Sequence, residues 1–374
     1  MGNWEYLPTD LLISISTCIA RNADYIRFRA ACSSWRSATD SRPHHLPRQI
    51  PFLLLPGETF TFYSPSENRS YHVPFSNGTQ YHFLGSSHGW LFLMGPTTSL
   101  FLLNPFARSM IALPPVVEIP NLFDQVTPTD VERYRGFMDR GDRSSTIGFW
   151  KYLLHKGKLC LDRGSTGFWI AVAFLKSGLA FYRPGDKSWA HAGRYWQFAD
   201  AELYNGQLYT ITRGGILSTI DVASSFKEAV VVSSSPFLFG QDVSIYLVGS
   251  AQDLLLVVRK YSYNSTGCRK TVGFEVYKLE TEEPGWTRVN KLGDQVIFLE
   301  RGTSVSLPAS GLDGFEGNCI HFTEAYDPCE EDKYKGMDIG CYELEGGNIR
   351  QLLCCSPYSE SAWPGPTWVT PCLW

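Results

Sequence analysis

The sequence predicts a mainly β protein, in which three short helices at the N-terminus precede a degenerate β-propeller of about six or seven blades. Three observations predict this fold. Helical periodicity is confined to roughly the first forty residues. Short apolar and aromatic runs bounded by Gly, Pro and Asn fill the remainder. Within that remainder, a Gly-containing turn followed by a Leu-aromatic pair recurs.

The first predicted helix lies in WEYLPTDLLISISTCIA. Thr9 or Asp10 can cap it, because both side chains accept hydrogen bonds from free backbone N–H groups. Helical spacing then puts four apolar residues on one face: Leu11, Leu12, Ile15 and Ile19. We therefore expect a short amphipathic helix.

Two further helices are expected in the next twenty or so residues. One can begin at Asn22 to Asp24, and another follows the Ser33-Ser34 break and includes Trp35. Helices this short bury little surface by themselves. Periodicity alone leaves two interpretations open: a cap on the following domain, or a surface whose surplus apolar residues bind a partner.

The Pro-rich junction RPHHLPRQIP marks a linker, and strand-length runs begin with FLLL at residue 52. We place the helical module at residues 3–42, the linker at 43–51 and the β domain at 52–374. Units of about forty to fifty residues would give a closed ring, with strand 52–55 completing the last blade. An irregular β-sandwich is the alternative. The segment 116–145 lacks strands and is expected to be a long loop.

Composition excludes several classes of function. The net charge of −4 and pI near 6.1 argue against nucleic acid or an anionic membrane as partner. The ten cysteines form no C-x-x-C pair, which argues against a zinc ribbon or a disulfide framework. No secretory signal or membrane-length apolar run is present, so we expect a cytoplasmic or nuclear protein.

One catalytic motif needs weighing. The segment GSSHG at 85–89 satisfies G-x-S-x-G, with Ser87 as its serine and His155, His191 and His321 downstream. A nucleophile elbow requires a helix after the serine, whereas GWLFLM has the length and composition of a strand. We expect a β-turn at this point and no catalytic residue, and a serine hydrolase is the third-ranked hypothesis.

No cofactor or metal site is expected. An acidic cluster could bind a hard cation, but it lacks regular ligand spacing, so a solvated loop is the preferred interpretation. Its members are Asp327, Glu330, Glu331, Asp332 and Asp338. The tryptophans could form a recognition surface, but most are expected to pack between blades.

The N-terminal residues favour the partner-binding interpretation. LPTDLLISI followed by DYIRFRAACSSWRSA resembles the F-box signature over roughly residues 4–42, with Ala31 at a position usually held by Val. The resemblance implies binding to a Skp-type adaptor of an SCF ubiquitin ligase and, through it, to a cullin. Six residues match the family's adaptor-contact positions: Leu7, Pro8, Leu11, Leu12, Ile15 and Trp35.

A second resemblance covers the β domain. GSSHGWLFL followed by LFLLNPFARSMIALPP is similar to a segment of plant F-box proteins whose C-terminal half is a kelch-like propeller of the KIB type. The implied function is a non-enzymatic substrate receptor that holds an unknown target protein on the propeller. The alternative is a propeller-based binding protein that does not join a ligase.

Overall fold

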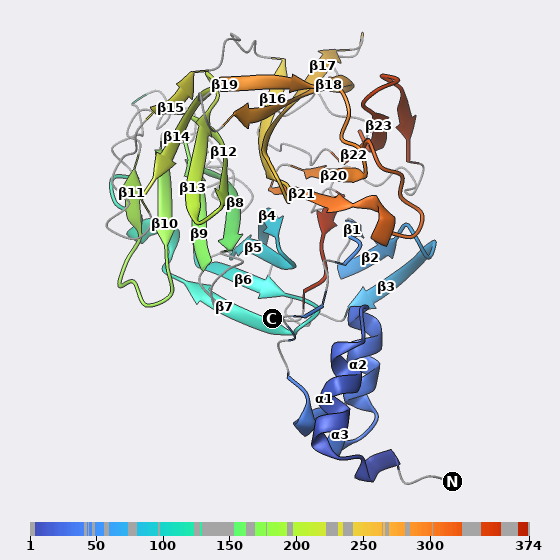
Figure 1. Ribbon diagram of the computed structural model, residues 1–374. Coiled ribbons are helices and arrows are strands. Elements are labelled where there is room, and N and C mark those ends of the chain that lie inside the picture. Colours follow the sequence, from blue (N-terminus) through green and yellow to red (C-terminus); the bar gives the residue numbers. More distant parts are fainter. Residues whose placement is uncertain are drawn as a thin grey trace.

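The computed structural model describes residues 4–122, 128 and 153–372, apart from the gaps 41–42, 44, 47–48, 56–59, 74–80, 96–97, 162–168, 177, 193–196, 222–230, 235–241, 264, 266–268, 281–284, 301, 324–337 and 353–365. A small helical module stands below a ring of sheets, and the C-terminus lies where the two meet (Figure 1).

The helical module contains η1 (Trp4–Tyr6), α1 (Thr9–Thr17), α2 (Asn22–Ala30) and α3 (Ser33–Ala38). We call residues 4–40 the handle. The expected start of the second helix is confirmed at Asn22. The third helix exists as expected, but it begins at Ser33, so the Ser33-Ser34 pair belongs to the helix and is not a break before it. The expected cap of the first is wrong: Pro8 occupies the N-cap position, and no side chain caps this end. The fixed φ of proline favours the chain direction needed to enter a helix, so the hydroxyl and carboxylate are not required there.

Six sheets surround a common axis, which confirms the propeller and excludes the sandwich. The first sheet contains, from the axis outward, β25 (Thr367–Val369), β1 (Phe52–Leu55), β2 (Phe60–Ser64) and β3 (Arg69–Val73). The second contains β4 (His82–Ser87), β5 (Trp90–Met94), β6 (Leu100–Asn104) and β7 (Ser109–Leu113). The third contains β8 (Leu154–Leu161), β9 (Trp169–Leu175), β10 (Gly178–Tyr182) and β11 (Ala190–Ala192).

The other three sheets complete the ring. The fourth contains β12 (Phe198–Tyr204), β13 (Gln207–Thr212), β14 (Ile216–Ile220) and β15 (Val231–Ser234). The fifth contains β16 (Val243–Gly249), β17 (Leu254–Tyr263), β18 (Arg269–Glu280) and β19 (Gly285–Val289). The sixth has five strands: β21 (Thr303–Pro308), β20 (Gln295–Glu300), β22 (Cys319–Phe322), β23 (Gly340–Glu343) and β24 (Ile349–Gln351).

The ring closes by pairing the two ends of the β domain. The expectation that strand 52–55 completes the last blade is wrong, because β1 pairs with β2 on one side and with the C-terminal β25 on the other. Leu53 is opposite Trp368, which is fully buried, and the Trp368 ring lies 5.2 Å from that of Phe298 in the sixth blade. Closure in this way ties the two ends of the β domain together in one blade, and the short inner edges of the blades are protected inside the ring.

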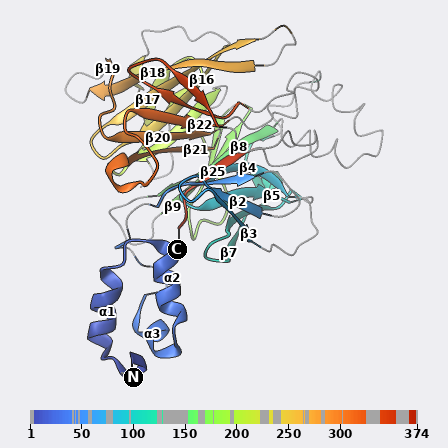
Figure 2. The same ribbon diagram turned by 90° about the vertical axis from the view of Figure 1, so that its right-hand side faces the viewer.

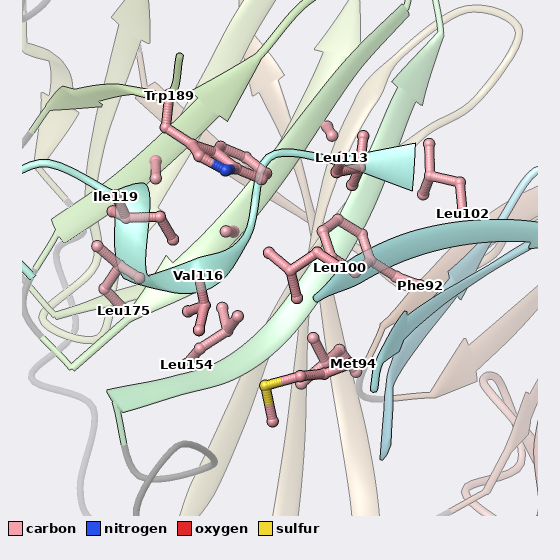
Figure 3. Packing of buried hydrophobic residues seen from close by; sticks show 14 of the residues in the cluster. Phe92, Met94, Leu100, Leu102, Leu113, Val116, Ile119, Leu154, Leu175 and Trp189 are labelled. Atoms are coloured by element: carbon pink, nitrogen blue, oxygen red, sulfur yellow. The ribbon is translucent and has the colours of Figure 1, made fainter. Parts of the chain in front are cut away.

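Apolar clusters fill the spaces between blades. In the cluster joining the second and third blades, Phe92 and Leu100 meet Leu154 and Trp189 (Figure 3). The Trp189 indole is buried and donates to the carbonyl oxygen of Pro114 at 2.8 Å. Trp189 therefore packs between blades and is not part of a recognition surface, as the sequence predicted for most of the tryptophans.

The strandless segment 116–145 lies largely outside the described residues. Its beginning forms η2 (Val116–Glu118) and packs onto the same core, with Val116 and Leu122 buried. At least this part of the expected loop is anchored by apolar contacts.

Candidate functional site

The handle has a small interior of its own. Leu12 and Tyr25 are each 1% exposed, and the Phe28 and Trp35 rings lie 4.4 Å apart. The Trp35 indole donates to the carbonyl oxygen of Trp4 at 3.0 Å, which ties η1 to α3. This interior uses few of the apolar residues that the handle carries.

Much of the remaining apolar surface faces outward. Among the described residues, six large apolar side chains of the handle are 41–75% exposed. They are Trp4, Tyr6, Leu11, Ile13, Ile15 and Ile26. Leu11 and Ile15 are one helical turn apart and share a side of α1, whereas Ile13 lies on another side of that helix. So many exposed apolar side chains on one short module favour contact with another protein. These residues belong to η1, α1 and α2 of the helical module, which lies below the ring (Figure 2).

The structure separates the six predicted contact residues into three groups. Pro8, Leu11 and Ile15 are exposed and available to a partner, whereas Leu7 and Trp35 are half-buried. Leu12, at 1% exposure, packs inside the handle and offers no surface.

Four exposed residues escaped the sequence prediction: Trp4, Tyr6, Ile13 and Ile26. Trp4 and Tyr6 precede the first helix, so no periodicity marks them. Ile13 and Ile26 lie outside the apolar face inferred from spacing. The signal that could have found them is a surplus of apolar residues over what three short helices can bury.

Polar contacts seat the handle on one face of the propeller. The Asn22 amide Nδ2 donates to the carbonyl oxygen of Pro371 at 3.2 Å, and its backbone N–H donates to Gln49 Oε1 at 3.0 Å. Gln49 Nε2 in turn donates to the carbonyl oxygen of Ala20 at 3.0 Å. The handle thus contacts both the segment that enters the ring and the one that leaves it.

Three glycine backbones approach one another closely inside the ring. A Cβ atom on Gly85 of β4 would collide with the carbonyl oxygen of Gly157 of β8, and one on Gly302 would collide with Gly85. Only glycine permits so close an approach of backbones. Inner strands β4 and β8 of neighbouring blades therefore approach closely, and Gly302, just before β21 of the sixth blade, packs against β4.

Beside these glycines lies a buried charge cluster, made of Lys156, Lys158, Asp200 and Glu202. Asp200 Oδ1 lies 2.8 Å from Lys156 Nζ and 3.3 Å from Lys158 Nζ, and Lys158 Nζ lies 2.8 Å from Glu202 Oε2. Lys158 also donates to Ser304 of the sixth blade, and Asp200 Oδ2 accepts from the Leu247 backbone N–H of the fifth.

Burial and the attraction between opposite charges shift the pKa values of this cluster in opposite directions. Burial alone would raise the pKa of Asp200, but the two ammonium groups hold it below its ordinary value. Burial would lower the pKa of Lys158, but Asp200 and Glu202 hold it above. For Lys156, burial prevails and the pKa is lowered. Every charge has a hydrogen-bonded partner, so the cluster joins blades and is not an open binding site.

The G-x-S-x-G segment forms the turn expected from the sequence. Ser87 ends β4, and β5 begins at Trp90, so a strand follows where an elbow would have a helix. Ser87 Oγ donates to the carbonyl oxygen of Leu159 at 2.6 Å. Burial and the nearby Lys158 lower the pKa of the adjacent His88 to about 4. The hydroxyl serves to join the second and third blades.

The expected solvated acidic loop is only partly described, because residues 324–337 fall in a gap. Asp338 is buried, contrary to expectation, and its Oδ2 lies 3.2 Å from Arg259 Nη2. Within the described part of the chain, no three His, Cys, Asp or Glu side chains gather as metal ligands would, and no helix is long and apolar enough to span a bilayer.

Comparison with known proteins assigns this architecture to a family. Residues 62–343, which run from β2 of the first blade to β23 of the sixth, match the KIB1-4 beta-propeller. The chain belongs to that family. Relatives from Arabidopsis thaliana align over almost the whole of this chain, handle included. F-box protein At2g17036 is 26% identical over 99% of this chain and 95% of its own length, and F-box protein SKIP23 is 25% identical over 99% and 96%.

The relatives are named F-box proteins, which agrees with the resemblance found in the handle. A third, F-box protein At2g26160, is 24% identical over 86% of this chain and 95% of its own length. The chain is therefore a member of a propeller family whose matched relatives are named F-box proteins.

Proposed function

We propose that the protein is the substrate-receptor subunit of an SCF-type ubiquitin ligase. Its handle binds a Skp-type adaptor, which links it to a cullin, and its propeller holds a target protein in the cytoplasm or nucleus. The observation that carries the proposal is the exposed apolar surface of the handle, formed by residues of an F-box-like sequence.

The size of this surface suits a stable partner. Burying a half-exposed Leu or Ile side chain contributes on the order of 1 kcal/mol. Leu11, Ile13, Ile15 and Ile26 are 41–50% exposed, and the larger rings of Trp4 and Tyr6 are 66% and 75% exposed. A partner that covers the side of α1 with Leu11 and Ile15 together with one of the two rings would gain a few kcal/mol toward association before its entropic cost.

The contribution of this chain to ubiquitin transfer is proximity. Holding the target beside a charged conjugating enzyme raises the effective concentration of its lysines without any bond-making by the receptor. The hydrogen bonds of Asn22 and Gln49 favour a defined orientation of the handle, so that adaptor and target stay at fixed relative positions.

The test is co-precipitation of a Skp-type adaptor and a cullin with the full-length chain. Wild type is expected to capture both. Ile15→Asp is expected to lose both, because an unpaired carboxylate in an apolar interface costs several kcal/mol. Ile15 is exposed, so this variant should fold, which a wild-type circular dichroism spectrum would verify.

Cullin provides an internal check, since the receptor reaches it only through the adaptor. Capture of neither protein by wild type, or equal capture by wild type and Ile15→Asp, would show that the chain is a propeller-based binding module outside the ligase.

A further inference from the structure

Lysine is missing from the first part of the chain. All 12 lysines lie between residues 151 and 335, although lysine is among the commonest residues of globular proteins. The first 150 residues carry 12 arginines instead. The handle and the strands of the first two blades, β1–β7 and β25, therefore contain no lysine. We call the handle and these strands the lysine-free zone.

The missing lysines do not reflect a preference of the whole sequence for arginine. From residue 151 onward, the chain has 12 lysines and nine arginines, so lysine is used freely there. Positive charge is not avoided in the first 150 residues either, because the arginines supply it. What is excluded from this part of the chain is the primary amine.

The exposed ion pairs of the handle do not require arginine. Arg21 Nη2 lies 2.7 Å from Asp313 Oδ2. Arg27 Nη1 lies 2.9 Å from Asp24 Oδ1. Each guanidinium uses one nitrogen, a contact that a lysine ammonium can also make, whereas arginine is needed for two-pronged contacts. Outside the zone, three ion pairs with half-exposed or exposed side chains do use lysine: Lys260–Glu275, Lys278–Glu280 and Lys291–Glu345.

The described lysines form two groups. Lys156 and Lys158 are buried in the charge cluster, so their amines are inaccessible. The others are half-buried or exposed and lie in or next to strands of the third, fifth and sixth blades. They are Lys176, Lys187, Lys260, Lys270, Lys278 and Lys291.

The lysine-free zone occupies the side of the ring next to the handle. In both ribbon views, β2, β3 and β7 lie in the lower part of the ring, towards the handle, and β16 to β19 lie at the top (Figures 1 and 2). Asn22 of α2 also donates to the carbonyl oxygen of Pro371, just after β25 of the first blade. The accessible lysines of the fifth blade are thus on the side of the ring away from the handle.

Ubiquitin transfer requires an accessible amine. The ε-amine of a lysine attacks the thioester carbonyl that joins ubiquitin to the conjugating enzyme. An amide bond forms, the carbon–sulfur bond breaks, the nitrogen gives up a proton and the thiol of the enzyme leaves. A guanidinium stays protonated and does not act as the nucleophile. Exchange of lysine for arginine therefore keeps the charge and removes the acceptor.

A receptor is itself exposed to this reaction. It stays beside the charged enzyme while successive targets are modified, so its own lysines within reach have a high effective concentration. Only surfaces within reach of the thioester need to lack lysine. The distribution of lysine along the chain therefore carries information about which side of the receptor the enzyme meets.

We propose that the lysine-free zone faces the charged conjugating enzyme in the assembled ligase and protects the receptor from ubiquitin transfer to itself. This inference rests on the proposed receptor function. It adds to that function the side of the propeller at which transfer takes place, namely the first and second blades and not the fifth.

The test is ubiquitin transfer by a reconstituted ligase without a target, in which the full-length chain is combined with a Skp-type adaptor, a cullin complex and a charged conjugating enzyme. Arg69→Lys on β3 and Arg108→Lys, just before β7, each put one amine into the first two blades at an exposed position. Arg288→Lys on β19 of the fifth blade is the matched control, since the Arg288 side chain is 60% exposed. Mass spectrometry measures ubiquitin at each introduced lysine. We expect about tenfold or more modification at the first two positions than at the control.

Capture of the adaptor separates the two possible failures. All three variants keep the charge and lie outside the handle, so each should capture the adaptor as wild type does. Normal capture together with modification of both introduced lysines within twofold of the control overturns the inference and leaves the receptor function standing. Absence of adaptor capture by wild type defeats the receptor function and this inference with it.

Discussion

Asp200→Asn provides the sharpest test of how the propeller is held together. The substitution keeps the side-chain shape but removes the charge shared by Lys156 and Lys158, at 2.8 and 3.3 Å. Breaking a buried ion pair by neutralising one partner costs about 3–5 kcal/mol, because the other charge stays buried. We expect the free energy of unfolding to fall by about 3–5 kcal/mol, which corresponds to a melting temperature lower by on the order of 10 °C.

The assay is urea unfolding followed by tryptophan fluorescence, with an exposed pair as control. Arg21 Nη2 lies 2.7 Å from Asp313 Oδ2, a distance like that in the buried pair, but the side chains are 69% and 78% exposed. Asp313→Asn should therefore cost less than about 1 kcal/mol. If Asp200→Asn lowers the free energy of unfolding no more than Asp313→Asn does, the buried charge cluster does not stabilise the propeller as proposed.

Further predictions concern the glycine contacts, the closure of the ring and acid stability. Gly85→Ala should lower the free energy of unfolding by about 3 kcal/mol in chemical denaturation, because the new Cβ would collide with the Gly157 backbone. Gly206→Ala should lower it by only about 1 kcal/mol, because Gly206 has open space around it and the only strain is its φ of +75°. Trp368→Ala should lower the unfolding free energy by about 3–5 kcal/mol, since the buried indole fills the closing blade; a change below 1 kcal/mol would contradict the role of β25. Burial lowers the pKa of His321 from 6.5 to about 4, so the unfolded chain takes up the proton first and stability should fall by about 3 kcal/mol between pH 6.5 and 4. His321→Phe should remove that loss in pH-dependent melting, and an unchanged pH profile would count against it.

The sequence predicted the handle well because short helices are encoded by local spacing. The same spacing could not divide the face of α1 into interior and surface. Leu11, Leu12 and Ile15 share one apolar arc, yet only Leu12 is buried, because the interior is narrow and is centred on Leu12 and Ser16. The width of that interior depends on how α3 packs, which periodicity does not contain.

The propeller was predictable as a class but not in its connections. The turns that contain Gly89 and Gly206 each join the inner strand of a blade to its second strand. The turn at Gly178 instead joins the second strand of its blade to the third. The repeated Gly-Leu-aromatic motif therefore does not mark equivalent positions in the blades. Closure by β25 pairs residues at opposite ends of the domain, which no local pattern encodes.

The charge cluster was missed for a related reason. Lys158 and Asp200 are 42 residues apart and meet only when neighbouring blades pack. A local signal existed in HKGKLCL, where two lysines interrupt a strand otherwise composed for burial. Buried lysines require partners, so that pattern alone could have predicted acidic residues on the next inner strand.

The central claim is that the exposed apolar surface of the handle binds the adaptor. Isothermal titration of a purified Skp-type adaptor into the full-length chain tests it most directly, with Leu11→Asp compared against Met110→Asp. Leu11 and Met110 are 50% and 52% exposed, so both variants add a carboxylate at an equally accessible apolar site. We expect wild-type affinity for Met110→Asp and a loss of about a hundredfold or more for Leu11→Asp. Equal affinities for the two variants, or no binding by wild type, would contradict the claim.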